Sequence, residues 1–145
     1  MNERLPERLV RLQGLKKVYR MGQEDVEVLR DVNLEIGKGS TVLILGESGS
    51  GKSTLLNMIG GLDEPSRGRV VVGGVDIAAL REHELSSFRT RTIGFIFQFH
   101  YLLKDFTALE NVALPALIDG RPLKEAKQQA GALLGEAVSY THLTL

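Results

Sequence analysis

An octapeptide at residues 46–53 sets narrow limits on how this chain folds. Gly46-Glu47-Ser48-Gly49-Ser50-Gly51-Lys52-Ser53 fits the pattern G-x-x-x-x-G-K-S/T. The run TVLIL at 41–45 precedes it, and apolar, β-branched-rich runs of this length are typical of strands buried on both faces. A helix-like pattern follows from Lys52 and ends at the pair Gly60-Gly61. The order strand, glycine-rich loop, helix therefore predicts an α/β fold.

The residue types of this loop suit the binding of a triphosphate. Glycines allow consecutive backbone N–H groups to turn inward and surround an anion. The helix that follows points the positive end of its dipole at the same place. Lys52 would reach the β- and γ-phosphates, and Ser53 would offer its hydroxyl to Mg²⁺, a cation that prefers oxygen ligands. The loop therefore predicts nucleotide binding, but it leaves the reaction open because many enzyme classes use it.

Composition excludes several other classes of protein. The 18 basic and 18 acidic side chains are evenly scattered, which argues against nucleic-acid binding, because that needs a basic stripe. The absence of cysteine excludes disulfides, thiolate metal sites and cysteine nucleophiles. His83, His100 and His142 have no ligand-like spacing. No apolar stretch reaches the length of about 18 residues that a membrane span needs. The length of 145 residues fits one domain.

The periodicity of the remaining chain predicts both strands and helices. Strands are expected at 9–19, 26–36, 69–72 and 93–97, and helices at 82–90 and 122–137. Residues 26–36 are expected to form either one half-buried strand or a strand pair with a bulge near Arg30. Thr107 and Glu110 match a capping box and predict a helix toward Ile118 that Pro115 could disturb. Strands ahead of the strand–loop–helix unit indicate an α/β sheet with an antiparallel edge region.

Further motifs make residues 9–136 resemble the nucleotide-binding domain of an ABC transporter. They are Lys16-Lys17-Val18-Tyr19, similar to the A-loop; LRDVNLEI at 29–36; GGLDEPSRG at 60–68; and IGFIFQ at 93–98, similar to the strand that ends in the Q-loop glutamine. The resemblance implies an α/β P-loop NTPase of the ABC type. Such a domain has an antiparallel β edge region and the start of a helical subdomain, and here it is expected to be incomplete.

The resemblance also implies roles for individual residues, with ATP and Mg²⁺ as ligands. ATP would be bound by Tyr19, Gly46, Glu47, Ser48, Gly49, Ser50, Gly51, Lys52, Ser53 and Thr54. Ser53 and Gln98 would hold Mg²⁺, and Lys52 and Gln98 would act in catalysis, with Gln98 contacting the attacking water. The ring of Tyr19 would stack on adenine; an ordinary strand aromatic is the alternative. A satisfied polar residue at a strand end is the alternative for Gln98.

The segment QFHYLLKDFTALENVALP at 98–115 narrows the resemblance. It is similar to the ATPase subunits of bacterial lipoprotein-releasing transporters, whereas macrolide exporters and cell-division complexes share a shorter frame and remain the alternative. The resemblance implies a cytoplasmic protein, peripheral on the inner membrane, that drives transmembrane subunits. Those subunits would dock on the region Phe99 to Asn111, whose apolar residues could instead pack beneath a lid. A second copy of the ATPase subunit would be the other partner, with no nucleic acid.

Several parts that hydrolysis needs in this family are absent from the 145 residues. There is no LSGGQ-like stretch, no apolar strand ending in an Asp-Glu pair and no switch histidine, and Asp63 and Glu64 are expected to be turn carboxylates. Residues 1–138 are therefore expected to be the N-terminal part of one ATP-binding domain, which by itself binds nucleotide without turnover. The ending SYTHLTL at 139–145 departs from the family and is expected to be a non-native tail; a divergent loop is the alternative.

Overall fold

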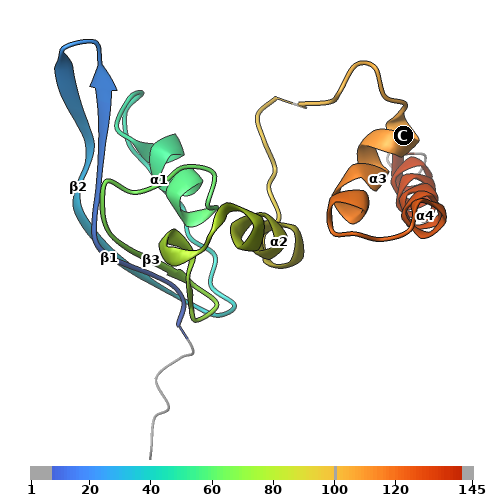
Figure 1. Cartoon of the computed structure of the whole chain (residues 1–145), viewed down its shortest axis with the longest axis horizontal. Coiled ribbons are helices and arrows are strands. Elements are labelled where there is room, and N and C mark those ends of the chain that lie inside the picture. Colours follow the sequence, from blue (N-terminus) through green and yellow to red (C-terminus); the bar gives the residue numbers. More distant parts are fainter. Residues whose placement is uncertain (1–7, 100, 142–145) are drawn as a thin grey trace, which may run out of the picture. The chain divides into compact units, whose positions relative to one another are not determined.

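The computed structural model describes residues 8–99 and 101–141 (Figure 1). The chain divides into two compact units, Met1–Leu85 and Ser86–Leu145. The first unit contains β1 (Arg8–Met21), β2 (Glu24–Gly37), α1 (Lys52–Ile59), β3 (Arg67–Val72), β4 (Val75–Asp76) and the 3-10 helix η1 (Ile77–Ala79). Helix α2 (Glu82–Thr92) crosses the division, and the second unit contains α3 (Ala108–Ile118) and α4 (Leu123–Thr141). The expected non-native tail at 139–145 begins within α4, and its residues 142–145 lie outside the described residues.

The strands of the first unit form an antiparallel sheet in the order β2-β1-β3-β4. Leu15 of β1 pairs with Val32 of β2, and Lys17 pairs with Leu29. Between these pairs, one residue of β1 lies opposite two residues of β2, Arg30 and Asp31. One of those two residues, Asp31, has a φ of 49°. The structure thus has the single strand of the first alternative together with the bulge of the second.

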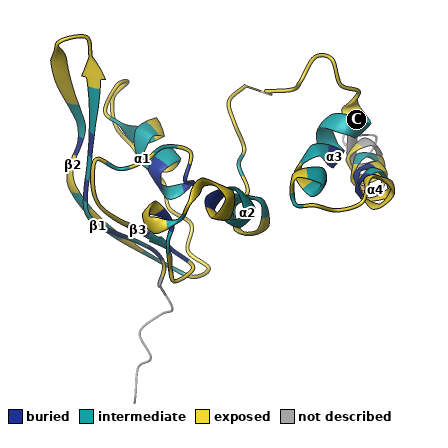
Figure 2. Cartoon of the chain, viewed as in Figure 1, coloured by how far each residue is buried: buried dark blue, intermediate teal, exposed yellow. Residues whose placement is uncertain are grey.

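One face of this sheet forms the core of the first unit. Leu12 and Val70 lie opposite each other on β1 and β3, and both are almost fully buried. Because side chains alternate along a strand, the inward positions recur every second residue. The buried apolar residues of the unit are Val10, Leu12, Leu15, Leu29, Met58, Val70, Val72, Ile77 and Leu85, drawn dark blue in Figure 2. Residues of α1, η1 and α2 thus complete a core begun by alternate residues of the strands.

The strands expected at 41–45 and 93–97 do not form, and this part of the sequence prediction is wrong. Leu43 and Leu45 are each 79% exposed, and Ile96 is fully exposed. The patterns that favour a buried strand are present, but a strand also needs a neighbour to accept and donate its backbone hydrogen bonds. In residues 8–99 and 101–141, sheet pairing is confined to β1–β4, so these apolar runs have no ladder to join.

The second unit is held together by small side chains between α3 and α4. Ala113, Ala126 and Ala130 are buried, with Leu109 and Val112 among the residues packed on them. Alanines at a helix–helix contact allow the two backbones to approach closely. Helix α3 continues through its internal proline, so the expected disturbance does not end it. Among the described helices, none combines the length and the apolar character needed to cross a membrane.

The expected capping box at the start of α3 is confirmed. The Glu110 N–H donates to the Thr107 hydroxyl oxygen at 3.3 Å, and the Thr107 N–H donates to the Glu110 carboxylate at 3.0 Å. Lys127 of α4 lies 3.6 Å from the other carboxylate oxygen. The pair therefore satisfies backbone groups that would otherwise lack partners at the helix end.

Acid is expected to open this capping box. Backbone and hydroxyl hydrogen bonds from Thr107, with a smaller contribution from Lys127, hold the pKa of Glu110 below its ordinary value of 4.5. A carboxylate with a lowered folded pKa stabilises the fold above the unfolded pKa, and this contribution is lost as the pH falls through the folded pKa. We expect the Thr107 amide chemical shift to titrate with a midpoint below 4.5 and the Glu110→Gln variant to show no such step. A midpoint at or above 4.5 would contradict the geometry.

Candidate nucleotide-binding site

The predicted phosphate loop bends sharply because its glycines adopt conformations that other residues rarely take. Gly49 and Gly51 have φ of 79° and 88°, in the left-handed region that favours glycine. A Cβ atom on Gly51 would lie 3.2 Å from the carbonyl oxygen of Val28 in β2, so space also restricts this position. The Ser50 N–H donates to the Glu47 carbonyl at 3.2 Å and closes a turn within the loop. The loop is thus a compact bend that approaches β2 closely.

Positive charge converges on this loop from two sources. Helix α1 begins at Lys52 with neither a side-chain cap nor an acidic residue in its first turn, so the positive end of its dipole faces the loop uncompensated. The Lys52 ammonium donates to the carbonyl oxygens of Gly46 and Glu47 at 2.8 and 2.5 Å, and to the Ser50 hydroxyl at 3.3 Å. The ammonium therefore lies across the loop, beside the positive end of the α1 dipole, and its contact with phosphates stays a prediction.

Two hydroxyl residues follow in the first turn of α1. Ser53 is exposed, and its contact with Mg²⁺ stays a prediction. The Thr54 side chain lies close enough to the Tyr19 hydroxyl to exert a small lowering effect on the pKa of Tyr19. The structure thus brings Tyr19, predicted to contact the base, next to the helix predicted to receive the phosphates.

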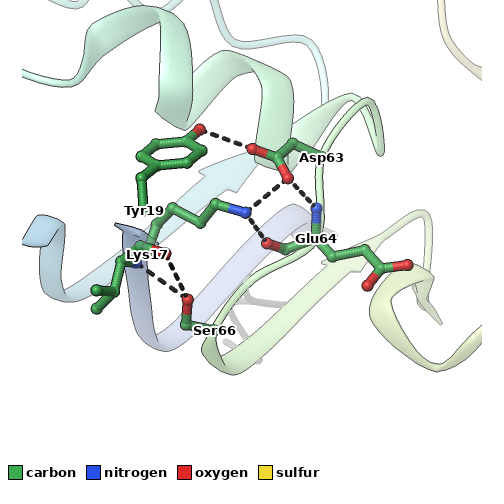
Figure 3. Close-up of polar contacts among 6 residues, drawn as sticks. Lys17, Tyr19, Asp63, Glu64 and Ser66 are labelled. Carbon is green, nitrogen blue, oxygen red and sulfur yellow. Dashed lines mark hydrogen bonds and ion pairs between the residues drawn. The ribbon is translucent and has the colours of Figure 1, made fainter. Parts of the chain in front are cut away.

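Tyr19 is fixed by a cluster of polar contacts that Figure 3 shows. Its hydroxyl donates to one carboxylate oxygen of Asp63 at 2.6 Å. The other carboxylate oxygen accepts from the Lys17 ammonium at 2.6 Å and from the Glu64 N–H at 2.7 Å. The Lys17 ammonium also lies 4.7 Å from the centroid of the Tyr19 ring, a cation–π contact, and donates to the Glu64 carbonyl at 2.7 Å. The cluster joins β1 to the turn between α1 and β3.

The pKa shifts in this cluster preserve its hydrogen bonds near neutral pH. Burial and the bond to Asp63 raise the pKa of Tyr19 above its ordinary value of 10.0, against a smaller opposing effect of Thr54. Burial alone would raise the pKa of Asp63, but the bonds from Lys17, Tyr19 and Glu64 outweigh it and leave the pKa below its ordinary value of 3.8. The phenol therefore stays protonated and donates, while the carboxylate stays ionised and accepts.

The contact between Asp63 and Tyr19 was missed by reasoning from the sequence, which treated Asp63 only as a turn carboxylate. One signal pointed toward it: Lys17 and Tyr19 are two residues apart on a strand, so both side chains lie on the same face. Nothing in the sequence says which acidic residue that face meets. The partner follows only from the path of the chain after α1, which returns the turn at 63–66 to β1, where the Ser66 N–H donates to the Lys16 carbonyl at 2.9 Å.

Gln98 lies in the second unit, whereas the phosphate loop lies in the first. Its side chain is exposed, and its contacts with Mg²⁺ and water stay predictions. His100 lies outside the described residues. The rest of the region Phe99 to Asn111 is described.

The region Phe99 to Asn111 combines exposed apolar side chains with an ordered backbone turn. Phe99 and Leu102 are 66% and 63% exposed, and Phe106 is 45% exposed. The Asn111 side-chain amide donates to the carbonyl oxygens of Leu103, Phe106 and Thr107 at 3.0–3.1 Å. Its oxygen accepts from the Leu103 N–H at 2.8 Å. One polar side chain thus holds the turn that presents the apolar ones.

A glycine loop of this pattern at the start of a helix is typical of P-loop nucleotide-binding proteins. The family model described as ABC transporter matches residues 29–143, and the chain therefore belongs to the ABC transporter family. The expected fold class, a P-loop NTPase of the ABC type, is confirmed.

The relatives and solved structures agree with this membership. Lipoprotein-releasing system ATP-binding proteins LolD from Chromohalobacter salexigens and Pseudomonas fluorescens are 48% and 52% identical over 128 residues, 88% of this chain. A dimeric post-hydrolysis structure of the ATP-binding cassette MJ0796 bound to ADP and Pi has a TM-score of 0.77 at 41% identity over 87% of this chain. The matches cover 54% and 56% of the two LolD proteins and 56% of MJ0796, so the chain spans about half the length of these relatives.

Proposed function

We propose that this chain is the ATP-binding part of an ABC transporter subunit that powers lipoprotein release from the bacterial inner membrane. The observation that carries the proposal is the Lys52 ammonium lying across the glycine loop at the start of α1. Support for the lipoprotein system comes from the relatives in two bacteria that are lipoprotein-releasing ATP-binding proteins. An exporter or a cell-division complex is the alternative assignment.

In this proposal the chain contacts both ends of the ATP molecule, the phosphates and the base. The loop N–H groups and Lys52 bind the phosphates, and the Tyr19 ring stacks on the base. Lys52 also stabilises charge that develops on the phosphoryl oxygens during transfer. Mg²⁺, when bound, neutralises phosphate charge, and the Ser53 hydroxyl and the Gln98 side-chain oxygen are its proposed protein ligands. Gln98 also orients the attacking water through its amide.

Two partners follow from the same proposal. A second copy of the full-length subunit would face the nucleotide, and the dimeric structures of MJ0796 support this part. Transmembrane subunits would dock on the region Phe99 to Asn111 on the cytoplasmic side. Support for this second part is the exposed apolar surface there, since exposed apolar patches mark interaction sites.

Binding without hydrolysis is the second candidate function. It is favoured by the 145-residue sequence itself, which contains no LSGGQ-like stretch and no apolar strand ending in an Asp-Glu pair. Without these groups the chain has a phosphate-binding loop but no identified acidic residue to act as general base.

Titration with Mg·ATP followed by a phosphate-release assay tests the proposal. We expect the chain to bind Mg·ATP saturably and to release phosphate no faster than a protein-free blank. Absence of saturable binding would contradict the proposed function. Measurable turnover that follows enzyme concentration would show that the catalytic groups are present after all.

A further inference from the structure

We propose that Asp63 and Lys17 are positioning residues that fix the Tyr19 ring for stacking on the nucleotide base. The inference rests on the proposed nucleotide binding and adds the side chains of Asp63, in the turn 63–66, and Lys17, in β1, as supports of the base-binding end of that site. Asp63 would act only through Tyr19, without touching the nucleotide.

Geometry supplies two separate restraints on the ring. The Asp63 carboxylate holds the hydroxyl end at 2.6 Å, and the Lys17 ammonium lies over one face at 4.7 Å from the centroid. Only two side-chain torsions place a tyrosine ring, so restraints at the hydroxyl and at one face leave it little freedom. A ring that is already ordered loses little entropy when a base stacks on it, which favours binding.

The carboxylate is suited to this task because its two oxygens serve different donors. One oxygen accepts from the Tyr19 hydroxyl, and the other accepts from the Lys17 ammonium and the Glu64 N–H (Figure 3). The same residue therefore ties the ring to the cation that lies over its face.

A purely structural role in holding the turn against β1 is the alternative. That role is already filled by Ser66, whose N–H donates to the Lys16 carbonyl at 2.9 Å. The Ser66 hydroxyl accepts from the Val18 N–H at 3.0 Å. Because these bonds hold the turn on the strand without involving the Tyr19 hydroxyl, the bond from Tyr19 to Asp63 serves to position the ring.

The test compares two ligands, Mg·ATP and Mg·tripolyphosphate, of which only the first has a base. Asn at position 63 keeps the side-chain shape but replaces one acceptor oxygen with an amide donor, so it cannot accept from both sets of donors. We expect Asp63→Asn to weaken Mg·ATP binding by about three- to tenfold and to change tripolyphosphate binding by less than about twofold. Glu64→Gln is the matched control, because its side chain makes no contact with the ring in Figure 3.

A second variant makes the result independent of how well Asp63→Asn folds. Tyr19→Phe keeps the ring and removes only the hydroxyl, so it should weaken Mg·ATP binding to a similar extent and spare tripolyphosphate. Asp63→Asn should then cause less additional loss in the Tyr19→Phe background than it does alone. Full Mg·ATP affinity in Tyr19→Phe, or equal losses for the two ligands in Asp63→Asn, would overturn the proposal.

The affinities of the wild-type chain for the two ligands distinguish failure of this inference from failure of the proposed function. Binding of neither ligand would contradict the phosphate site itself and, with it, the inference. Equal affinity for Mg·ATP and tripolyphosphate would leave the phosphate site intact and overturn the role of Tyr19 and its positioning residues.

Discussion

Lys52→Ala is expected to abolish measurable Mg·ATP binding, with a loss of about a hundredfold or more in affinity. The variant removes the ammonium that lies across the loop and contacts the Gly46 and Glu47 carbonyl oxygens and the Ser50 hydroxyl. The dipole of α1 would still attract an anion, but it carries only about half a charge and cannot replace a full one close to the phosphates. Isothermal titration calorimetry with Mg·ATP measures the loss directly.

Lys124→Ala is the control for this variant. It removes the same charge from an exposed position in α4, far along the sequence from the loop, so Mg·ATP affinity should stay at the wild-type value. If Lys52→Ala kept its affinity while both variants folded, residues 46–53 would not be a phosphate-binding loop.

Gly68→Ala is expected to destabilise the first unit by about 2–4 kcal/mol. Gly68 has a φ of 91°, where an L side chain is strained. An added Cβ atom would also lie 2.4 Å from the Gly14 carbonyl oxygen and 2.6 Å from that of Gln13, both of which belong to the β1 backbone. Because a backbone cannot rotate away as a side chain can, the pairing of β1 with β3 has to shift. Hydrogen exchange of the β1 and β3 amides reports this loss.

Gly74→Ala isolates the contribution of the clash from that of the backbone angle. Gly74 has a similar φ of 83°, but an added Cβ atom there meets nothing within 4 Å. We expect this variant to lower the free energy of unfolding by about 1 kcal/mol, which is the effect of the left-handed conformation alone. Equal protection of the strand amides in both variants would show that the start of β3 relieves the clash without further loss of stability.

The elements that the sequence could predict are those with local causes. Alternation of apolar residues predicts β1 and β2, and the hydrogen bonds of Thr107 and Glu110 place the start of α3. Helix α1 begins where the loop pattern ends, at Lys52. Each of these features depends on residues that are close in sequence, so a single sequence contains the necessary information.

The features that could not be predicted depend on partners distant in sequence. The runs at 41–45 and 93–97 have the composition of buried strands, but forming a strand depends on a neighbour that composition does not reveal. The same holds for Asp63, whose carboxylate contacts Tyr19 across 44 residues of sequence. Local motifs therefore predicted where the glycine loop lies and where α1 begins, whereas the residues that support Tyr19 could not be predicted from them.

The most direct test of the central claim is a Mg·ATP titration of the chain followed by amide chemical shifts, residue by residue. The claim is that residues 46–54 bind the phosphates and that Tyr19 binds the base. The predicted result is saturable shifts at residues 46–54 and at Tyr19, with the amides of α3 unchanged. Saturable shifts that spare residues 46–54 would contradict the claim. The absence of any shift at about several millimolar Mg·ATP, a concentration at which even weak binding is detected, would also contradict it.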